Sequence, residues 1–275
     1  MSQAKAADGT KLYYEVQGSG PAIVFVHELA GTCRSFDAQV AALKPRFQCI
    51  TFNARGYPPS DVPSSAESFS QDIAAADIGA VMDAVGVRDA HVMGVSMGSA
   101  AALQFALANP TRVRSAILCS IGSGSDAKPD EYVANMEAMA ARVEKNGAAQ
   151  IRENFTTSPA RLKLKEKNPA EFEKFLQELA NFSVLGLTNT MRGVQKRRPP
   201  LYAHKDKIAA MKIPTLVVLG GDDAGCAKPS QFLKETLPGA RLEILPNTGH
   251  GVNIEEPARV NRMVAEFIDA VEARR

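Results

Sequence analysis

Residues 91–102 read His91-Val-Met-Gly-Val-Ser-Met-Gly-Ser-Ala-Ala-Ala102, and they predict a strand, a sharp turn and a helix. Within them, Gly94-Val95-Ser96-Met97-Gly98 forms a G-x-S-x-G pattern. A serine on such a turn has a strained backbone and an exposed hydroxyl, and the two glycines avoid collisions with the neighbouring strand and helix. The first N–H groups of the helix point at the same place. The stretch therefore predicts Ser96 as a nucleophile; the alternative is a purely structural turn.

A serine hydroxyl is a poor nucleophile at neutral pH, so Ser96 needs a base and a group that orients the base. The chain has four histidines, of which His250 lies in a loop between the last predicted strand and the last predicted helix. That loop lies at the carboxyl edge of the sheet, as Ser96 does. His91 begins a strand and is expected to point away, and His204 ends a central helical stretch. His250 is the predicted base; the alternative is an idle loop histidine.

The orienting carboxylate is expected to follow a strand as well. Residues 215–225, Thr-Leu-Val-Val-Leu-Gly-Gly-Asp-Asp-Ala-Gly, place Asp222 and Asp223 after an apolar run. We predict that Asp223 is the acid and keep Asp222 as the alternative. The other aspartate is expected to cap the turn, which is an ordinary role for this residue type.

Short apolar runs alternate with helical patterns along most of the chain. Continuous apolar runs are typical of strands that are buried on both faces of a parallel sheet, so the alternation predicts a doubly wound α/β fold. The predicted strands are Lys11–Tyr14, Ala22–His27, Gln48–Asn53, His91–Val95, Ala116–Ser120, Thr215–Leu219 and Arg241–Leu245, and the predicted helices span residues 35–44, 70–85, 97–108, 229–236 and 254–272.

The alternation stops over residues 122–205, where no strand is predicted. Apolar residues recur there at spacings of three and four, and Pro159, Pro169, Pro199 and Pro200 divide the stretch into short pieces. We interpret it as a helical insertion. The predicted division is therefore a core domain of residues 1–121 and 206–275 and a helical cap of residues 122–205. A basic run at Arg192 and 196–198 is interpreted as a solvated face or a cap–core linker.

Composition excludes several classes of protein. The 275 residues are 45% hydrophobic and 23% charged, with a net charge of +2. These numbers exclude a disordered or fibrous chain, and the weak net charge argues against nucleic acid and membrane partners. The chain has four scattered cysteines, with no CxxC pair. Together with the absence of a predicted signal peptide or membrane span, they indicate a thiol-reduced, cytoplasmic protein without a zinc site.

Several segments match, in order, the pattern of the α/β-hydrolase superfamily. Gly18–His27 resembles the run into its oxyanion strand, and Phe52–Asp61 resembles its D-x-R-G-x-G-x-S segment. Gly220–Asp223 resembles its G-x-x-D acid turn, which favours Asp223, and Asn247–His250 resembles its final histidine turn. The resemblance covers residues 11 to about 270. It implies a doubly wound, mostly parallel sheet with a helical cap inserted after the sixth strand, as in capped esterases, lactonases and C–C hydrolases.

The same resemblance implies an oxyanion hole made by the backbone N–H groups of Leu29 and Met97. The sequence departs from the pattern here, because the usual His-Gly-x-x-Gly is His27-Glu28-Leu29-Ala30-Gly31. Glu28 replaces a glycine. We expect it to be buried and paired with Arg55, because a buried carboxylate needs a partner; the alternative is an extra acid or base near the site. The His-Glu pair does not continue as H-E-x-x-H, so no zincin-type metal site is predicted.

The predicted function is hydrolysis of a small-to-medium ester or lactone through an acyl-enzyme on Ser96. A meta-cleavage C–C hydrolase and a cofactor-free perhydrolase would use the same triad, and a small-molecule receptor with a retained triad is the alternative from another class. No cofactor and no metal are predicted. The sequence leaves the physiological substrate and the formation of a homodimer open.

Overall fold

The computed structural model describes residues 2–125 and 129–275. Eight strands form one sheet in the order β1-β2-β4-β3-β5-β6-β7-β8. Strands β1 and β2 are antiparallel to their neighbours, whereas β4, β3, β5, β6, β7 and β8 pair in parallel. The strands are β1 (Gln3–Lys5), β2 (Lys11–Gln17), β3 (Ala22–Val26), β4 (Gln48–Phe52), β5 (Ala90–Val95), β6 (Val113–Cys119), β7 (Thr215–Gly220) and β8 (Arg241–Leu245).

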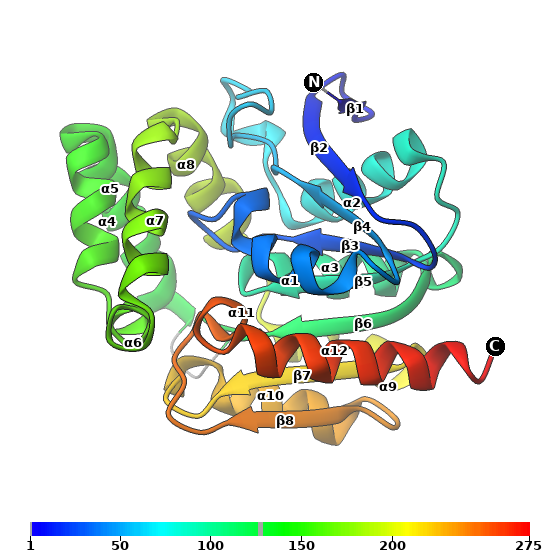
Figure 1. Ribbon diagram of the computed structural model, residues 1–275. Coiled ribbons are helices and arrows are strands. Elements are labelled where there is room, and N and C mark those ends of the chain that lie inside the picture. Colours follow the sequence, from blue (N-terminus) through cyan, green and yellow to red (C-terminus); the bar gives the residue numbers. More distant parts are fainter. Residues whose placement is uncertain (1, 126–128) are drawn as a thin grey trace.

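Helices cover both faces of this sheet (Figure 1). On one face lie α1 (Asp37–Leu43) and α12 (Pro257–Glu272), and on the other lie α2 (Gln71–Val85), α3 (Met97–Ala108), α9 (Lys205–Ala210) and α10 (Ala224–Thr236). Side chains of the central strands alternate between the two cores: in β3, Ile23 and Phe25 join one, and Val24 and Val26 join the other. This explains the uninterrupted apolar runs of the central strands.

All seven predicted strands are present, whereas strand β1, helix α9 and the start of helix α10 were not predicted from the sequence. Strand β1 pairs with β2 alone. Its three residues are too few to show the alternation of apolar and polar residues that identifies a strand. Helix α10 begins at Ala224, five residues before Pro229, where we had expected it to start. Among the described residues, no helix is long and apolar enough to cross a bilayer.

The described part of the chain between β6 and β7 contains helices joined by short turns, and no strand. Its main helices are α4 (Pro129–Asn146), α5 (Ala148–Thr156), α6 (Pro159–Lys167), α7 (Pro169–Glu178) and α8 (Val184–Thr190), the last continuing into a π-helical turn, Met191–Gln195. These helices lie beyond the carboxyl ends of the strands, at the left of Figure 1. Prolines occupy the first turns of α6 and α7, where the missing N–H costs nothing.

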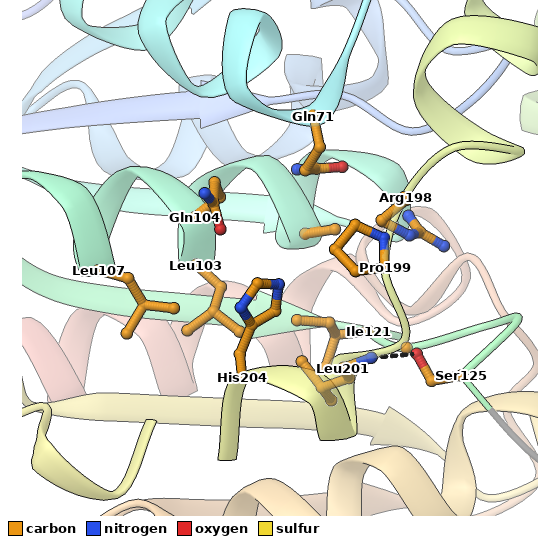
Figure 2. A pocket seen from close by; sticks show the side chains of 12 residues that line it. Gln71, Leu103, Gln104, Leu107, Ile121, Ser125, Arg198, Pro199, Leu201 and His204 are labelled. Atoms are coloured by element: carbon orange, nitrogen blue, oxygen red, sulfur yellow. Dashed lines mark hydrogen bonds between the residues drawn. The ribbon is translucent and has the colours of Figure 1, made fainter. Parts of the chain in front are cut away.

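Two connections join this helical segment to the core, and they lie against each other beside α3 (Figure 2). The Leu201 N–H donates to Ser125 Oγ at 3.0 Å, and Arg198 donates to the Ser123 carbonyl at 2.7 Å. The rest of the basic run pairs with acids: Arg192 with Glu137 and Glu144, Lys196 with Glu137, and Arg197 with Glu67. The linker interpretation of this run therefore agrees with its contacts.

A buried charge cluster fixes the start of the chain against α2. Arg55 donates to both carboxylate oxygens of Asp77, at 2.8 and 2.7 Å, and to Asp8 at 2.6 Å. The side chains of Arg55 and Asp77 are only 5% and 3% exposed. The Arg55 hydrogen bond, with smaller contributions from Thr10, lowers the pKa of Asp8 to about 2 against the opposing effect of burial.

We expect Arg55→Met to lower the free energy of unfolding by about 3–5 kcal/mol, because it leaves the Asp77 carboxylate buried without its partner. Urea unfolding followed by circular dichroism measures the change. Arg241→Met is the matched control, since Arg241 pairs with Glu243 at the surface and such pairs contribute about 0–1 kcal/mol. Equal losses in the two variants would contradict the assignment of the cluster.

Candidate active site

The predicted nucleophile lies on a tight turn between β5 and α3. Ser96 has φ 52° and ψ −112°, a conformation that a non-glycine residue adopts only under strain. A Cβ atom added at Gly94 would lie 2.3 Å from the Gly98 carbonyl oxygen, and one at Gly98 would lie 1.9 Å from that of Val26. Both glycines are therefore required for the close approach of the helix to the sheet.

A serine that sequence reasoning overlooked locks this turn. The Ser99 hydroxyl lies between the carbonyl oxygens of Gly94 (2.7 Å) and Cys119 (2.8 Å), and it is fully buried. The Ser96 N–H also donates to Cys119 O, at 2.8 Å. The turn is thus attached to the end of the neighbouring strand β6. The signal available in the sequence was a serine among alanines in the first turn of the predicted helix.

The predicted base and acid meet at the same edge of the sheet. His250 Nδ1 lies 2.7 Å from Asp223 Oδ2. Burial acts to raise the Asp223 pKa, but the hydrogen bond and charge of His250, together with Cys226 and Ser120, outweigh it and hold that pKa below its ordinary value. Asp223 is therefore ionised at neutral pH and fixes the orientation of the imidazole.

The histidine loop is attached to β6 beside the nucleophile turn. Ser120, whose φ is 51°, donates its hydroxyl hydrogen to the His250 carbonyl at 2.8 Å. Cys119 and Ser120 are successive residues, and they hold the Ser96 backbone and the His250 backbone respectively. This arrangement brings the loops of Ser96 and His250 together. Ser120 ended a predicted strand in the sequence and carried no further signal.

The alternative residues lie elsewhere or have other partners. Asp222 is 44% exposed and pairs with Lys163 at 3.3 Å. His27 is buried, with Nδ1 against the Glu28 carbonyl and Nε2 accepting the Ala54 N–H. His91 is buried against Ser115, and His204 faces Leu103 and Leu107 of α3 in a separate small pocket (Figure 2). Of the four histidines, His250 is the one that lies beside an ionised aspartate.

Cys226 lies next to this pair and was not expected there. Its Sγ is 3.9 Å from His250 Nδ1 and 3.2 Å from the Ser120 carbonyl. The three groups of Asp223, Cys226 and His250 lie within 4.8 Å of one another, a spacing that a metal ion could use. However, burial raises the pKa of the Cys226 thiol well above its ordinary value, and Asp223 and His250 already bond each other. These contacts fit a neutral thiol in a hydrogen-bonded group.

The predicted oxyanion donors flank the nucleophile turn. Met97 is the first residue of α3, where backbone N–H groups have no partner within the helix. Leu29 lies in the loop after β3, in which the Ala30 N–H donates to Tyr57 Oη (3.4 Å) and the Gly31 N–H to the Glu28 carbonyl (2.9 Å). Ala30, with φ 59°, is the loop residue in the left-handed region, so Glu28 needs no glycine-like conformation there.

The predicted pairing of Glu28 with Arg55 is wrong. Arg55 points toward α2 and binds Asp77 and Asp8, whereas Glu28 Oε1 accepts from Arg161 Nη2 of α6 at 3.1 Å. Both members of the second pair are buried, at 3% and 4% exposure. The physical reason is that α2 offers Arg55 a carboxylate that accepts two hydrogen bonds. The partner of Glu28 comes from a helix more than 130 residues later, which the sequence pattern could not place.

A second carboxylate shapes the histidine loop from α11 (Val252–Glu255). Glu255 accepts the N–H groups of Gly249 (2.6 Å) and Gly251 (3.1 Å), the two neighbours of His250. Its side chain is buried, and burial raises its pKa, although these N–H groups, Lys167 and Arg161 act in the opposite direction. From the sequence, Glu255 falls within the predicted helix of residues 254–272, and nothing there signals this contact.

Comparison with known proteins identifies the family. A model of the α/β hydrolase fold matches residues 21–257. The chain is 28% identical to 3-oxoadipate enol-lactonase 1 of Acinetobacter baylyi, over 96% of this chain and 95% of that protein. It is also 28% identical to a 2-hydroxy-6-oxononadienedioate/2-hydroxy-6-oxononatrienedioate hydrolase of Burkholderia vietnamiensis, over 95% and 92% of the two chains.

The fold also agrees with a solved structure. A thermophilic esterase from Thermogutta terrifontis superposes with a TM-score of 0.85 at 24% identity, covering 98% of each chain. Its similarity extends the agreement in fold to the helical segment between β6 and β7. The chain belongs to the α/β-hydrolase family and is an enzyme with hydrolase activity.

Proposed function

We propose that this hydrolase cleaves a small-to-medium carboxylic ester or lactone through an acyl-enzyme on Ser96. The observation that carries the proposal is the 2.7 Å contact between His250 and the ionised Asp223. Ser120 holds the loop of His250 beside the turn that carries Ser96. The enol-lactonase relative and the esterase neighbour support the choice of an ester or lactone bond.

In the proposed reaction, His250 takes the proton of the Ser96 hydroxyl as its oxygen attacks the carbonyl carbon. Asp223 stabilises the imidazolium that forms. The N–H groups of Leu29 and Met97 receive the negative charge of the tetrahedral intermediate. His250 then gives its proton to the leaving alcohol, and a water molecule activated by His250 releases the acid from Ser96.

The helical segment favours a compact, apolar substrate. Its apolar residues, among them Phe172, Phe175 and Leu187, form one buried cluster with Ala30, Tyr57, Met97 and Ile254 of the core. A cap of residues 122–205 that packs directly on the predicted oxyanion donors would cover the acyl group. Leu185 of the same segment is 43% exposed and does not contribute to that cluster.

The relative from Burkholderia vietnamiensis supports C–C bond hydrolysis as the alternative reaction. The triad would be the same, so a substrate test decides between the two reactions. The perhydrolase and the receptor remain further alternatives. A receptor would bind one small molecule tightly and would not turn over a series of esters.

We expect Ser96→Ala to lower kcat toward p-nitrophenyl butyrate by at least about 10³-fold, since the residual rate would come from binding and the oxyanion hole alone. Stopped assays at saturating ester measure it, and Ser64→Ala, an exposed loop serine, is the control. A chain-length series from acetate to decanoate then sizes the acyl pocket. Equal rates for wild type and Ser96→Ala would contradict the proposal.

The two neighbouring aspartates provide a matched comparison. We expect Asp223→Asn to lower kcat by about 10³–10⁴-fold, because an amide neither stabilises the imidazolium nor holds the correct tautomer. Asp222→Asn is expected to stay within a few fold of wild type, since that carboxylate pairs with Lys163 at the surface. The measurement is kcat for p-nitrophenyl butyrate at pH 7.5. A larger loss in Asp222→Asn would exchange the two roles.

A further inference from the structure

A buried guanidinium from the helical segment lies between the two loops that the proposed reaction depends on. Arg161 of α6 is 4% exposed, and its Nη2 donates to Glu28 Oε1 at 3.1 Å. Glu28 directly precedes Leu29, the predicted oxyanion donor. The guanidinium also stacks on Phe175 of α7, with its carbon 4.5 Å from the ring centroid. One cation therefore holds the oxyanion loop against the helices that cover it.

The same guanidinium reaches the histidine loop. A Cβ atom added at Gly251 would lie 3.2 Å from Arg161 Nη1, so the group packs directly on the residue after His250. Its charge acts on Glu255, the carboxylate that binds the N–H groups on either side of His250. Arg161 thus hydrogen-bonds Glu28 of the oxyanion loop and acts through its charge on Glu255 of α11, which binds the histidine loop.

This cluster is not optimised for stability. Among the residues that the structure describes, Arg161 Nη1 and Glu28 Oε2 have no hydrogen-bond partner although both atoms are buried. Buried charges with unmatched hydrogen bonds cost free energy, and an ion pair of this kind is weak evidence for a stabilising role. Position 28 is also the one where this chain carries glutamate in place of the glycine of the related pattern. Both facts favour a role in the site.

We propose that Arg161 is a positioning residue that sets the oxyanion loop and the His250 loop relative to each other, through Glu28 and Glu255. The inference rests on the proposed function. It predicts that the charge of Arg161, and not merely the volume of its side chain, is required for a productive arrangement of Leu29, Ser96 and His250.

We expect Arg161→Met to lower kcat for p-nitrophenyl butyrate by about 10- to 100-fold with a smaller change in KM, because a displacement of catalytic groups by about 1 Å has effects of up to this size. The acid limb of kcat/KM is also expected to move to higher pH. Without the cation, the Glu255 carboxylate protonates at a higher pH and releases the Gly249 and Gly251 N–H groups. Lys167, which also pairs with Glu256, is another charge that lowers the pKa of Glu255.

Two further variants separate positioning from simple stability. Arg161→Lys keeps the charge, so its acid limb is expected to stay close to that of the wild type. The double variant Glu28→Gly/Arg161→Met removes both buried charges and is expected to regain the melting temperature lost in Arg161→Met while its acid limb stays shifted. Arg192→Met is the matched control, since Arg192 pairs with Glu137 and Glu144 within the helical segment.

The outcomes are distinct. Wild-type kcat and acid limb in Arg161→Met would overturn the inference, and so would a double variant that regains both the melting temperature and the wild-type acid limb. If Arg161→Met does not fold, the lysine and double variants carry the test. A fluorophosphonate probe and ester turnover monitor the proposed function separately: if the wild type is labelled and hydrolyses p-nitrophenyl butyrate while Ser96→Ala does neither, the proposed function stands whatever the Arg161 variants do. If the probe labels neither protein, the proposed function fails first.

Discussion

The close approach of α3 to the sheet is the constraint on which the site depends. Gly98 lies so near the Val26 carbonyl that no side chain fits between them, and Gly94 has the same relation to Gly98. With the helix pressed onto β3 and β5, the intervening Ser96 is forced to a φ of 52°. The first N–H groups of α3 then point to the place where the loop after β3 also arrives. The strain at Ser96 is maintained by the packing around it.

The end of β6 joins this turn to the rest of the site. The Cys119 carbonyl accepts hydrogen bonds from Ser96 and Ser99. The next residue, Ser120, holds the backbone of His250 and helps to lower the pKa of Asp223. The end of β6 therefore helps to fix the positions of the three loops that carry Ser96, Asp223 and His250. Glu255 completes the histidine loop from the other side by binding the two glycine N–H groups that flank His250. A polar network with so many shared members is expected to respond as a unit when one member is removed.

The sequence predicted seven of the strands, a mostly parallel sheet and the residues of the turn that carries Ser96 because these features are local. Alternation of apolar runs with helical periods identifies a buried parallel sheet, and parallel strands collect their following loops at one edge. This is why the sequence could predict that Ser96, Asp223 and His250 lie at the same edge of the sheet. The pattern failed at β1, where three residues give no period, and at Glu28, whose partner lies in the helical segment.

What the sequence by itself determined was the family, the doubly wound sheet and the identity of the residues at its carboxyl edge, since these follow from short-range patterns and matching motifs. Only the tertiary structure decided which charges meet. Arg55 binds Asp77 and Asp8, Arg161 binds Glu28, and Ser99, Ser120 and Glu255 lock the loops. The physical reason is that a buried charge or hydroxyl chooses its partner by distance and geometry in space, and separation along the chain carries no information about either.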